Sequence, residues 1–224
     1  MTLDTYLGGW VSKIDKKELS KVLRQLEVEY KQKLIEPSQE DVFKAFHLCP
    51  YNDLKVIFLG MDPYPQKGIA TGILFGNKKS TIELSPSLEI LKECVIDYTS
   101  PKDYIIFDNT LEEWCSQGIL MLNSALTVET NNIGSHINLW RPFISSLLKN
   151  LSKSNSGIIY VLFGEKAQTF LPYINNSTNY IIKVRHPGFY VRTGQRMPRE
   201  WFISMNNTLK HLYGEEIKWF ESGQ

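Results

Sequence analysis

The chain has 224 residues, of which 42% are hydrophobic and 22% are charged, and this composition predicts one globular domain spanning residues 1–224 that needs no disulfide or metal to fold. No run approaches 18 consecutive apolar residues, which excludes a membrane span, and residues 1–9 lack the basic and apolar regions of a secretory signal. The three cysteines show no metal-ligand spacing, which excludes a zinc site and fits a reducing compartment. A net charge of +1 leaves nucleic-acid binding open, because a local basic face is enough to contact a few phosphates.

The hydrophobic periodicity predicts an alternation of helices and short apolar strands. In chain order, helices are expected at residues 17–33 and 39–46, a strand at 55–60, helices at 83–98 and 110–116, a strand at 119–122, a helix at 140–151, a strand at 157–164, a helix at 165–174, a strand at 180–184 and a helix at 198–213. Apolar strands separated by helices are typical of parallel sheets that are buried on both faces. We therefore predict an α/β fold with a four-stranded, mostly parallel sheet covered by helices on both faces.

Polar residues follow three of the four predicted strands. Asp62 comes after the first strand, on a turn that is stiffened by Pro63 and Pro65; Asn123 ends the second strand; and His186 follows the fourth. Open α/β sheets bind their ligands at the carboxyl ends of the strands, so these side chains are candidates for one site. Two alternatives remain from the residues alone: Asp-Pro is a common turn opener, and a lone histidine is often a satisfied core residue.

A basic stretch runs through residues 183–199, which contain five lysine and arginine residues, His186 and no acid. This charge bias suits contact with phosphates, whereas the alternative is a solvated face. The usual nucleotide-binding motifs G-x-G-x-x-G and G-x-x-x-x-G-K-[ST] are absent, as are G-x-S-x-G and H-E-x-x-H. A serine hydrolase and a zinc peptidase are therefore disfavoured.

Gly60-Met-Asp-Pro-Tyr-Pro65 resembles the G-Q-D-P-Y-H signature of family 1 uracil-DNA glycosylases, and its final proline is similar to the poxvirus branch of that family. The residues before the first strand (39–46) and the segment Leu120-Met-Leu-Asn-Ser-Ala-Leu-Thr-Val128 resemble further family motifs in the family's order, and matches continue to Trp201. The resemblance implies a uracil-DNA glycosylase-like fold and a monofunctional enzyme without metal or cofactor. Such an enzyme flips deoxyuridine out of DNA and hydrolyses its N-glycosidic bond. It releases uracil and leaves an abasic site for base excision repair.

The resemblance also implies roles for individual residues. Asp62 would position the attacking water and stabilise the sugar cation, and His186 would hydrogen-bond O2 of the departing uracil. Phe75 would stack on the uracil ring, Tyr64 would occupy the space of a thymine methyl group, and the Asn123 amide would read the edge of uracil. Asn123 is poorly explained by packing, since a polar amide closes an apolar run.

Several positions depart from the family pattern. Met61 stands where the family has glutamine, a position that acts mainly through its backbone N–H in binding uracil. Ser87 is interpreted as either a helix cap or a phosphate ligand, and Lys166 replaces part of the family's G-S-H-A segment. Residues 186–191 replace H-P-S-P-L-S, so that Gly188 lacks the serine hydroxyl and Tyr190 stands at the position of the leucine wedge. We predict that this segment is a DNA-binding loop flanked by Arg192, and that Tyr190, or Phe189 if the register slips, enters the duplex.

The expected partners are single- and double-stranded DNA that contains uracil and, by resemblance, an inhibitor protein that mimics DNA. We expect a monomer with no membrane association, located in the cytoplasm of a bacterium or in the nucleus or viral factory of an infected eukaryotic cell. A different class of function is the alternative: a DNA-binding replication accessory module on a glycosylase scaffold, with weak or no catalysis. A generic α/β hydrolase is a third and weaker interpretation.

Overall fold

A four-stranded sheet forms the centre of the computed structural model, which describes residues 2–99 and 105–222. Its strands are β2 (Val56–Gly60), β4 (Ile119–Asn123), β6 (Ile159–Phe163) and β7 (Tyr180–Val184), in the spatial order β4-β2-β6-β7. All three neighbouring pairs are parallel. The prediction of a four-stranded parallel sheet is confirmed, and the four predicted strands coincide with the observed ones to within two residues at each end.

Burial explains why these segments are strands. Every residue of β2, β4 and β6 is buried, as expected for apolar strands with a covered sheet face on either side, whereas the edge strand β7 is partly exposed. The register pairs Gly60 with Asn123 and Phe163 with Val184. The carboxyl ends of the four strands therefore lie at one edge of the sheet, and the residues that follow them meet there.

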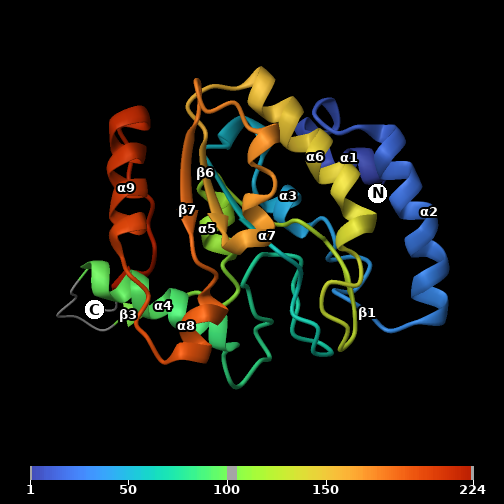
Figure 1. Cartoon of the computed structure of the whole chain (residues 1–224), viewed down its shortest axis with the longest axis horizontal. Coiled ribbons are helices and arrows are strands. Elements are labelled where there is room, and N and C mark those ends of the chain that lie inside the picture. The colour runs from blue at the N-terminus through green and yellow to red at the C-terminus, as the bar shows by residue number, and fades with distance from the viewer. Residues whose placement is uncertain (1, 100–104, 223–224) are drawn as a thin grey trace.

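Helices lie on both sides of the sheet, with α9 on one side and α6 and α2 on the other (Figure 1). The helices of the described residues are α1 (Leu3–Leu7), α2 (Lys16–Gln32), α3 (Lys44–Leu48), α4 (Pro86–Thr99), α5 (Glu112–Ser116), α6 (Ile137–Ser154), α7 (Gly164–Gln168), α8 (Pro187–Thr193) and α9 (Glu200–Tyr213), with the 3₁₀ turns η1 (Gly8–Ser12), η2 (Tyr51–Asp53) and η3 (Leu171–Tyr173). Two short antiparallel pairs complete the fold: β1 (Ile35–Glu36) with β5 (Val128–Glu129), and β3 (Ile105–Ile106) with β8 (Glu221–Ser222). None of the helices within these residues is long and apolar enough to cross a bilayer.

Helix α2 shows how the sequence sets these elements. The Asp15 side chain precedes it and accepts hydrogen bonds from the backbone N–H groups of Lys17 and Glu18, which satisfies the start of the helix. Its apolar face buries Leu19, Val22 and Leu26, and this face brings α2 against α6.

Three predicted elements differ from the structure. The helix expected at residues 39–46 begins only at Lys44, and the helix expected at 165–174 ends at Gln168 and is followed by the separate turn η3. The segment after β7 was expected to be a loop, but it forms α8. Pro187 stands in the first turn of α8, where its missing N–H is tolerated, and the His186 side chain caps that turn.

Candidate active site

A cavity of about 370 Å³ opens at the carboxyl edge of the sheet. Asp62, Tyr64, Phe75, Asn123 and His186 all line it. The remaining lining residues are Met61, Pro63, Pro65, Ala70, Thr71, Gly72, Ile73, Leu74, Ser87, Ile133, Gly188 and Arg192. The structure thus brings together all the residues that the sequence placed in catalysis and uracil binding.

Asp62 reaches this cavity from the turn that follows β2. Its Oδ2 accepts a hydrogen bond from the Gly134 N–H at 2.6 Å. Burial raises the pKa of Asp62, while the Gly134 N–H opposes that effect by stabilising the charged form. A carboxylate held in this way presents a negative charge in a partly dehydrated site, where it interacts strongly with a developing cation.

His186 lines the same cavity from just after β7, and its ring is held in one tautomer. The Gly188 backbone N–H donates to Nδ1 at 3.0 Å, so Nδ1 is an acceptor and the hydrogen of the neutral ring lies on Nε2. Burial lowers the pKa of His186, and the nearby positive charge of Arg192 lowers it further. The site therefore holds a neutral imidazole whose Nε2–H can donate to a ligand.

The backbone of Gly164, after β6, makes room for this histidine. Gly164 has φ = +81°, and a Cβ built at this position would lie 3.0 Å from Cβ of His186. Only glycine combines this left-handed backbone with so close an approach. The Gly-Glu-Lys-Ala segment thus contributes a space for His186 as well as the basic side chain of Lys166.

Phe75 forms an aromatic wall of the cavity and has φ = +64°, which is uncommon for an aromatic residue. Its ring packs edge-on against Phe163 and against the His186 ring, with centroids 5.2 and 5.5 Å apart. The Tyr64 hydroxyl donates to the Phe75 carbonyl at 3.2 Å. A backbone held in a sparsely populated region beside a cavity is the kind of strain that packing maintains at functional sites.

Asn123 is buried at the end of β4, and its Oδ1 has no hydrogen-bond partner among the described residues. A buried amide oxygen without a partner is costly, so it marks a place where a ligand donor is expected. A Cβ on its strand neighbour Gly60 would come within 2.3 Å of a Leu74 methyl group and 3.2 Å of the Asn123 oxygen. Glycine at position 60 therefore leaves room for both side chains.

A second cavity, of about 600 Å³, adjoins the first and shares Met61, His186 and Arg192 with it. Its lining is basic on balance, with Lys166, Arg185 and Arg192 against one acid, Glu165. Phe189 also lines it, and the Arg185 guanidinium carbon lies 4.6 Å from the centroid of the Phe189 ring. This groove places cations and an aromatic ring beside the opening of the pocket.

The structure corrects two expectations about the DNA-binding residues. Ser87 lines the pocket but does not cap α4: the helix begins at Pro86, and the carbonyl of Ser85 accepts the N–H of Leu88 at 2.8 Å. Tyr190 is not on an exposed loop. It lies on α8, is 6% exposed and belongs to the core, because α8 packs against α4 and buries the large ring of Tyr190. Of the two aromatic residues, Phe189 is the one that lines the groove.

Sequence reasoning missed three residues that shape the site. Gly134 binds Asp62, Arg185 covers Phe189, and Asn77 holds Ser85 at the start of α4 through bonds of 2.7 Å to its Oγ and its N–H. The cluster Asn-Asn-Ile-Gly-Ser at 131–135 is a turn signal, but nothing in it reports proximity to Asp62.

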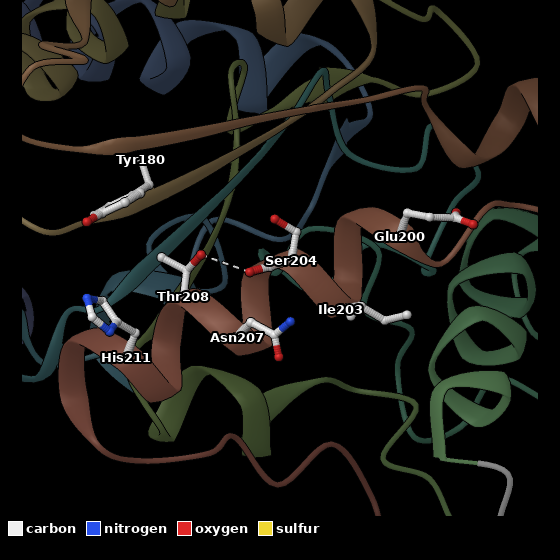
Figure 2. A pocket seen from close by; sticks show the side chains of 7 residues that line it. All are labelled: Tyr180, Glu200, Ile203, Ser204, Asn207, Thr208 and His211. Atoms are coloured by element: carbon white, nitrogen blue, oxygen red, sulfur yellow. Dashed lines mark hydrogen bonds between the residues drawn. The ribbon is translucent and has the colours of Figure 1, made fainter.

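Another hollow, of about 490 Å³, lies between β7 and α9 (Figure 2). Tyr180 borders it from β7, and the side chains on the facing stripe of α9 are mostly polar. It contains none of the candidate residues. Across the described part of the chain, no group of three histidine, cysteine or acidic side chains is arranged to hold a metal ion.

The parallel sheet defines an α/β protein. The pocket at the carboxyl edge of the sheet suits a small polar ring, and the basic groove beside that pocket suits a polyanion attached to the ring. Residues 46–210 match the model of the uracil DNA glycosylase superfamily, and the chain belongs to that superfamily. The chain is 33% identical over 217 residues to a uracil-DNA glycosylase of Mycoplasmopsis pulmonis, which covers 94% of this chain and 96% of the relative. It is 37% identical over 207 residues to a uracil-DNA glycosylase of Buchnera aphidicola, covering 92% and 93% respectively.

Solved structures agree on the fold. A mimivirus uracil-DNA glycosylase variant in complex with UGI superposes with a TM-score of 0.82 at 24% identity, covering 98% of this chain and 91% of that one. A uracil-DNA glycosylase from Nitratifractor salsuginis superposes with a TM-score of 0.58 at 18% identity, covering 94% and 88%.

Proposed function

We propose that this chain is a uracil-DNA glycosylase that hydrolyses the N-glycosidic bond of deoxyuridine in DNA, and that it belongs to family 1. Relatives with that activity in their names match it over nearly its whole length. The observation that carries the proposal is the meeting of Asp62, Asn123 and His186 in one cavity, where the amide oxygen of Asn123 lacks a partner and the imidazole presents Nε2–H. The Gly60–Pro65 motif supports the assignment to family 1.

Recognition of uracil follows from three side chains. The base would stack on Phe75, while the Asn123 amide accepts from N3–H and donates to O4. Cytosine presents the opposite donor and acceptor pattern at these two positions, so it would leave the buried amide mismatched. Tyr64, whose hydroxyl is bonded to the Phe75 carbonyl, would fill the space that the methyl group of thymine requires. The backbone N–H of Met61 would add a donor to the base.

Bond cleavage would use opposite properties of Asp62 and His186. As the glycosidic bond breaks, positive charge develops on the sugar and negative charge on the departing uracil. Asp62, ionised and held by Gly134, would stabilise the cation and orient the water that attacks it. His186 would donate Nε2–H to uracil O2, which favours the anionic leaving group without requiring full proton transfer.

The basic groove is proposed to hold the DNA backbone beside the flipped nucleotide. Lys166, Arg185 and Arg192 would supply the positive charge for phosphates, and Ser87 would supply a hydroxyl from the lining of the adjoining cavity. Phe189 would stack on a base of the duplex near the gap left by the flipped uracil. We also propose that the chain acts as a monomer and that an inhibitor protein that mimics DNA can occupy this face, since a structural neighbour was solved with UGI.

Excision of uracil from a labelled oligonucleotide, measured in EDTA on single strands and on duplex, tests the proposal. Wild-type protein should convert the substrate to an abasic product, whereas Asp62→Asn should be slower by roughly 10²–10³-fold because a preorganised charge is lost. Asp53→Asn, which removes an exposed carboxylate outside the site, should leave the rate unchanged. Tight binding of uracil-containing DNA by wild-type protein without cleavage would instead identify a binding module.

A further inference from the structure

The turn formed by residues 131–135, between β5 and α6, carries the N–H that holds Asp62. Gly134 donates from this turn to Asp62 Oδ2 at 2.6 Å. The turn is closed by hydrogen bonds from Asn132 N to the Glu129 carbonyl at 2.9 Å and from Glu129 N to Ser135 Oγ at 2.8 Å. Because the turn is internally bonded, the position of the Gly134 N–H depends on how the turn is attached to the rest of the protein.

His136 makes one such attachment, two residues after Gly134, and the Asn131 N–H, which donates to the Pro65 carbonyl at 3.0 Å, makes another. It is 3% exposed, and its Nδ1 lies 2.8 Å from Thr127 Oγ1. The indole N–H of Trp140 donates to the same Oγ1 at 2.7 Å. Nε2 lies 2.8 Å from Glu29 Oε2, and a carboxylate only accepts, so the neutral imidazole carries its hydrogen on Nε2 and its Nδ1 accepts from the Thr127 hydroxyl.

Glu29 anchors this chain of contacts to α2, the helix that packs beside α6 (Figure 1). Its side chain accepts from Gln25 Nε2 at 2.7 Å and lies 3.9 Å from Lys33 Nζ. Burial alone would raise the pKa of Glu29, but Gln25, His136 and Lys33 outweigh burial and lower it. Glu29 is thus a carboxylate that faces a buried imidazole at the root of the turn.

We infer that Glu29 and His136 are positioning residues for Asp62, which act by holding the 131–135 turn so that the Gly134 N–H stays on the carboxylate. The inference rests on the proposed role of Asp62. Neither residue lines the pocket, so neither contacts the base. Their effect passes through two residues of backbone and one hydrogen bond.

The geometry predicts a specific consequence for the pH dependence of the reaction. The Gly134 N–H is a group that lowers the pKa of Asp62 against the effect of burial. If the turn loosens, that pKa rises, and the ionised form required for catalysis is lost at a higher pH on acidification. The other charged or titratable groups are Tyr64, His186 and Arg192 in the pocket of Asp62, and Lys33 and Glu129 near His136.

Glu29→Gln tests the inference with Glu27→Gln as its matched control. Glu27 lies on the same helix, is exposed, and is paired with Lys31 at 3.0 Å, so the control removes the same charge without touching the turn. Glu29→Gln should move the acid limb of kcat/KM upward by about half a pH unit or more and should lower kcat about fivefold with KM nearly unchanged. Amide exchange at Gly134 should also become faster, whereas Glu27→Gln should match wild type in all three measurements.

The inference is overturned if Glu29→Gln has the same acid limb of kcat/KM as wild type and the same amide exchange at Gly134, even when its Tm is lower. That result would leave Glu29 a purely structural role. The proposed function fails by a different result, namely tight binding of uracil-containing DNA by wild-type protein without cleavage. The amide exchange of Gly134 needs no substrate, so it reports on the anchoring of the turn whichever way the activity measurements fall.

Discussion

Gly164→Ala should slow uracil excision by displacing His186, although residue 164 itself makes no contact with the base in the proposed mechanism. The added Cβ would lie 3.0 Å from Cβ of His186, and ordinary contacts begin at 3.4 Å, so the histidine must move by about 0.4 Å. A misplacement of about 1 Å can reduce a rate about 10²-fold, and by proportion this shift predicts a loss of roughly sixfold. The displacement acts on the donor to uracil O2, so kcat should fall more than KM rises.

Gly214→Ala is the matched control for this experiment. Gly214 has φ = +66°, close to the +81° of Gly164, but a Cβ on Gly214 meets no atom within 4 Å. Alanine in the left-handed region costs about 1–2 kcal/mol at either position, so both variants should show a similar fall in Tm. Only Gly164→Ala should be slow in single-turnover excision from a single-stranded oligonucleotide. Equal single-turnover rates for the two variants would refute the reasoning, since they would show that the position of His186 does not limit the reaction.

Three further results are expected. Tyr64→Ala should release thymine and Asn123→Asp should release cytosine, each measured on an oligonucleotide that carries that base at the target position. If both variants still excise uracil but neither releases its new base, the assigned pocket is contradicted. Phe189→Ala should slow uracil excision from duplex DNA more than from single strands, whereas Tyr190→Ala should mainly lower Tm. An equal loss of excision rate on the two substrates in Phe189→Ala would contradict its stacking role. Burial raises the pKa of Asp62, so the rate of excision should decline on acidification at a pH above the usual pKa of an aspartate. A decline that begins only at or below that usual pKa would argue against Asp62 as the ionised group.

The sheet and the main pocket residues could be predicted from the sequence because their signals are local. Strands such as Ile119–Asn123 are continuous apolar runs, and a parallel sheet brings the residues that follow each strand to the same edge. The prediction therefore joined Asp62, Asn123 and His186 without knowledge of any contact. The resemblance added Tyr64 and Phe75, whose positions in the wall of the pocket no local pattern reveals.

Predictions failed where tertiary packing decides the outcome. Residues 187–193 contain glycine, aromatic and basic side chains, a mixture typical of a loop, but the capped first turn and the packing of α8 against α4 make them helical. The contact of Gly134 with Asp62 spans 72 residues in the sequence, and that of His136 with Glu29 joins two helices, so neither leaves a periodic trace.

The proposed mechanism needs Asp62 charged and His186 neutral, although both residues are half-buried. Burial alone drives each towards its uncharged form, raising the pKa of Asp62 and lowering that of His186. The backbone separates the two outcomes: the Gly134 N–H points at Asp62 and favours the anion, whereas the Gly188 N–H points at Nδ1 of His186 and favours the neutral ring. Both donors are glycine N–H groups beside the cavity. The charge proposed to stabilise the sugar cation and the neutral donor proposed for the leaving base therefore both depend on where these two backbone N–H groups lie.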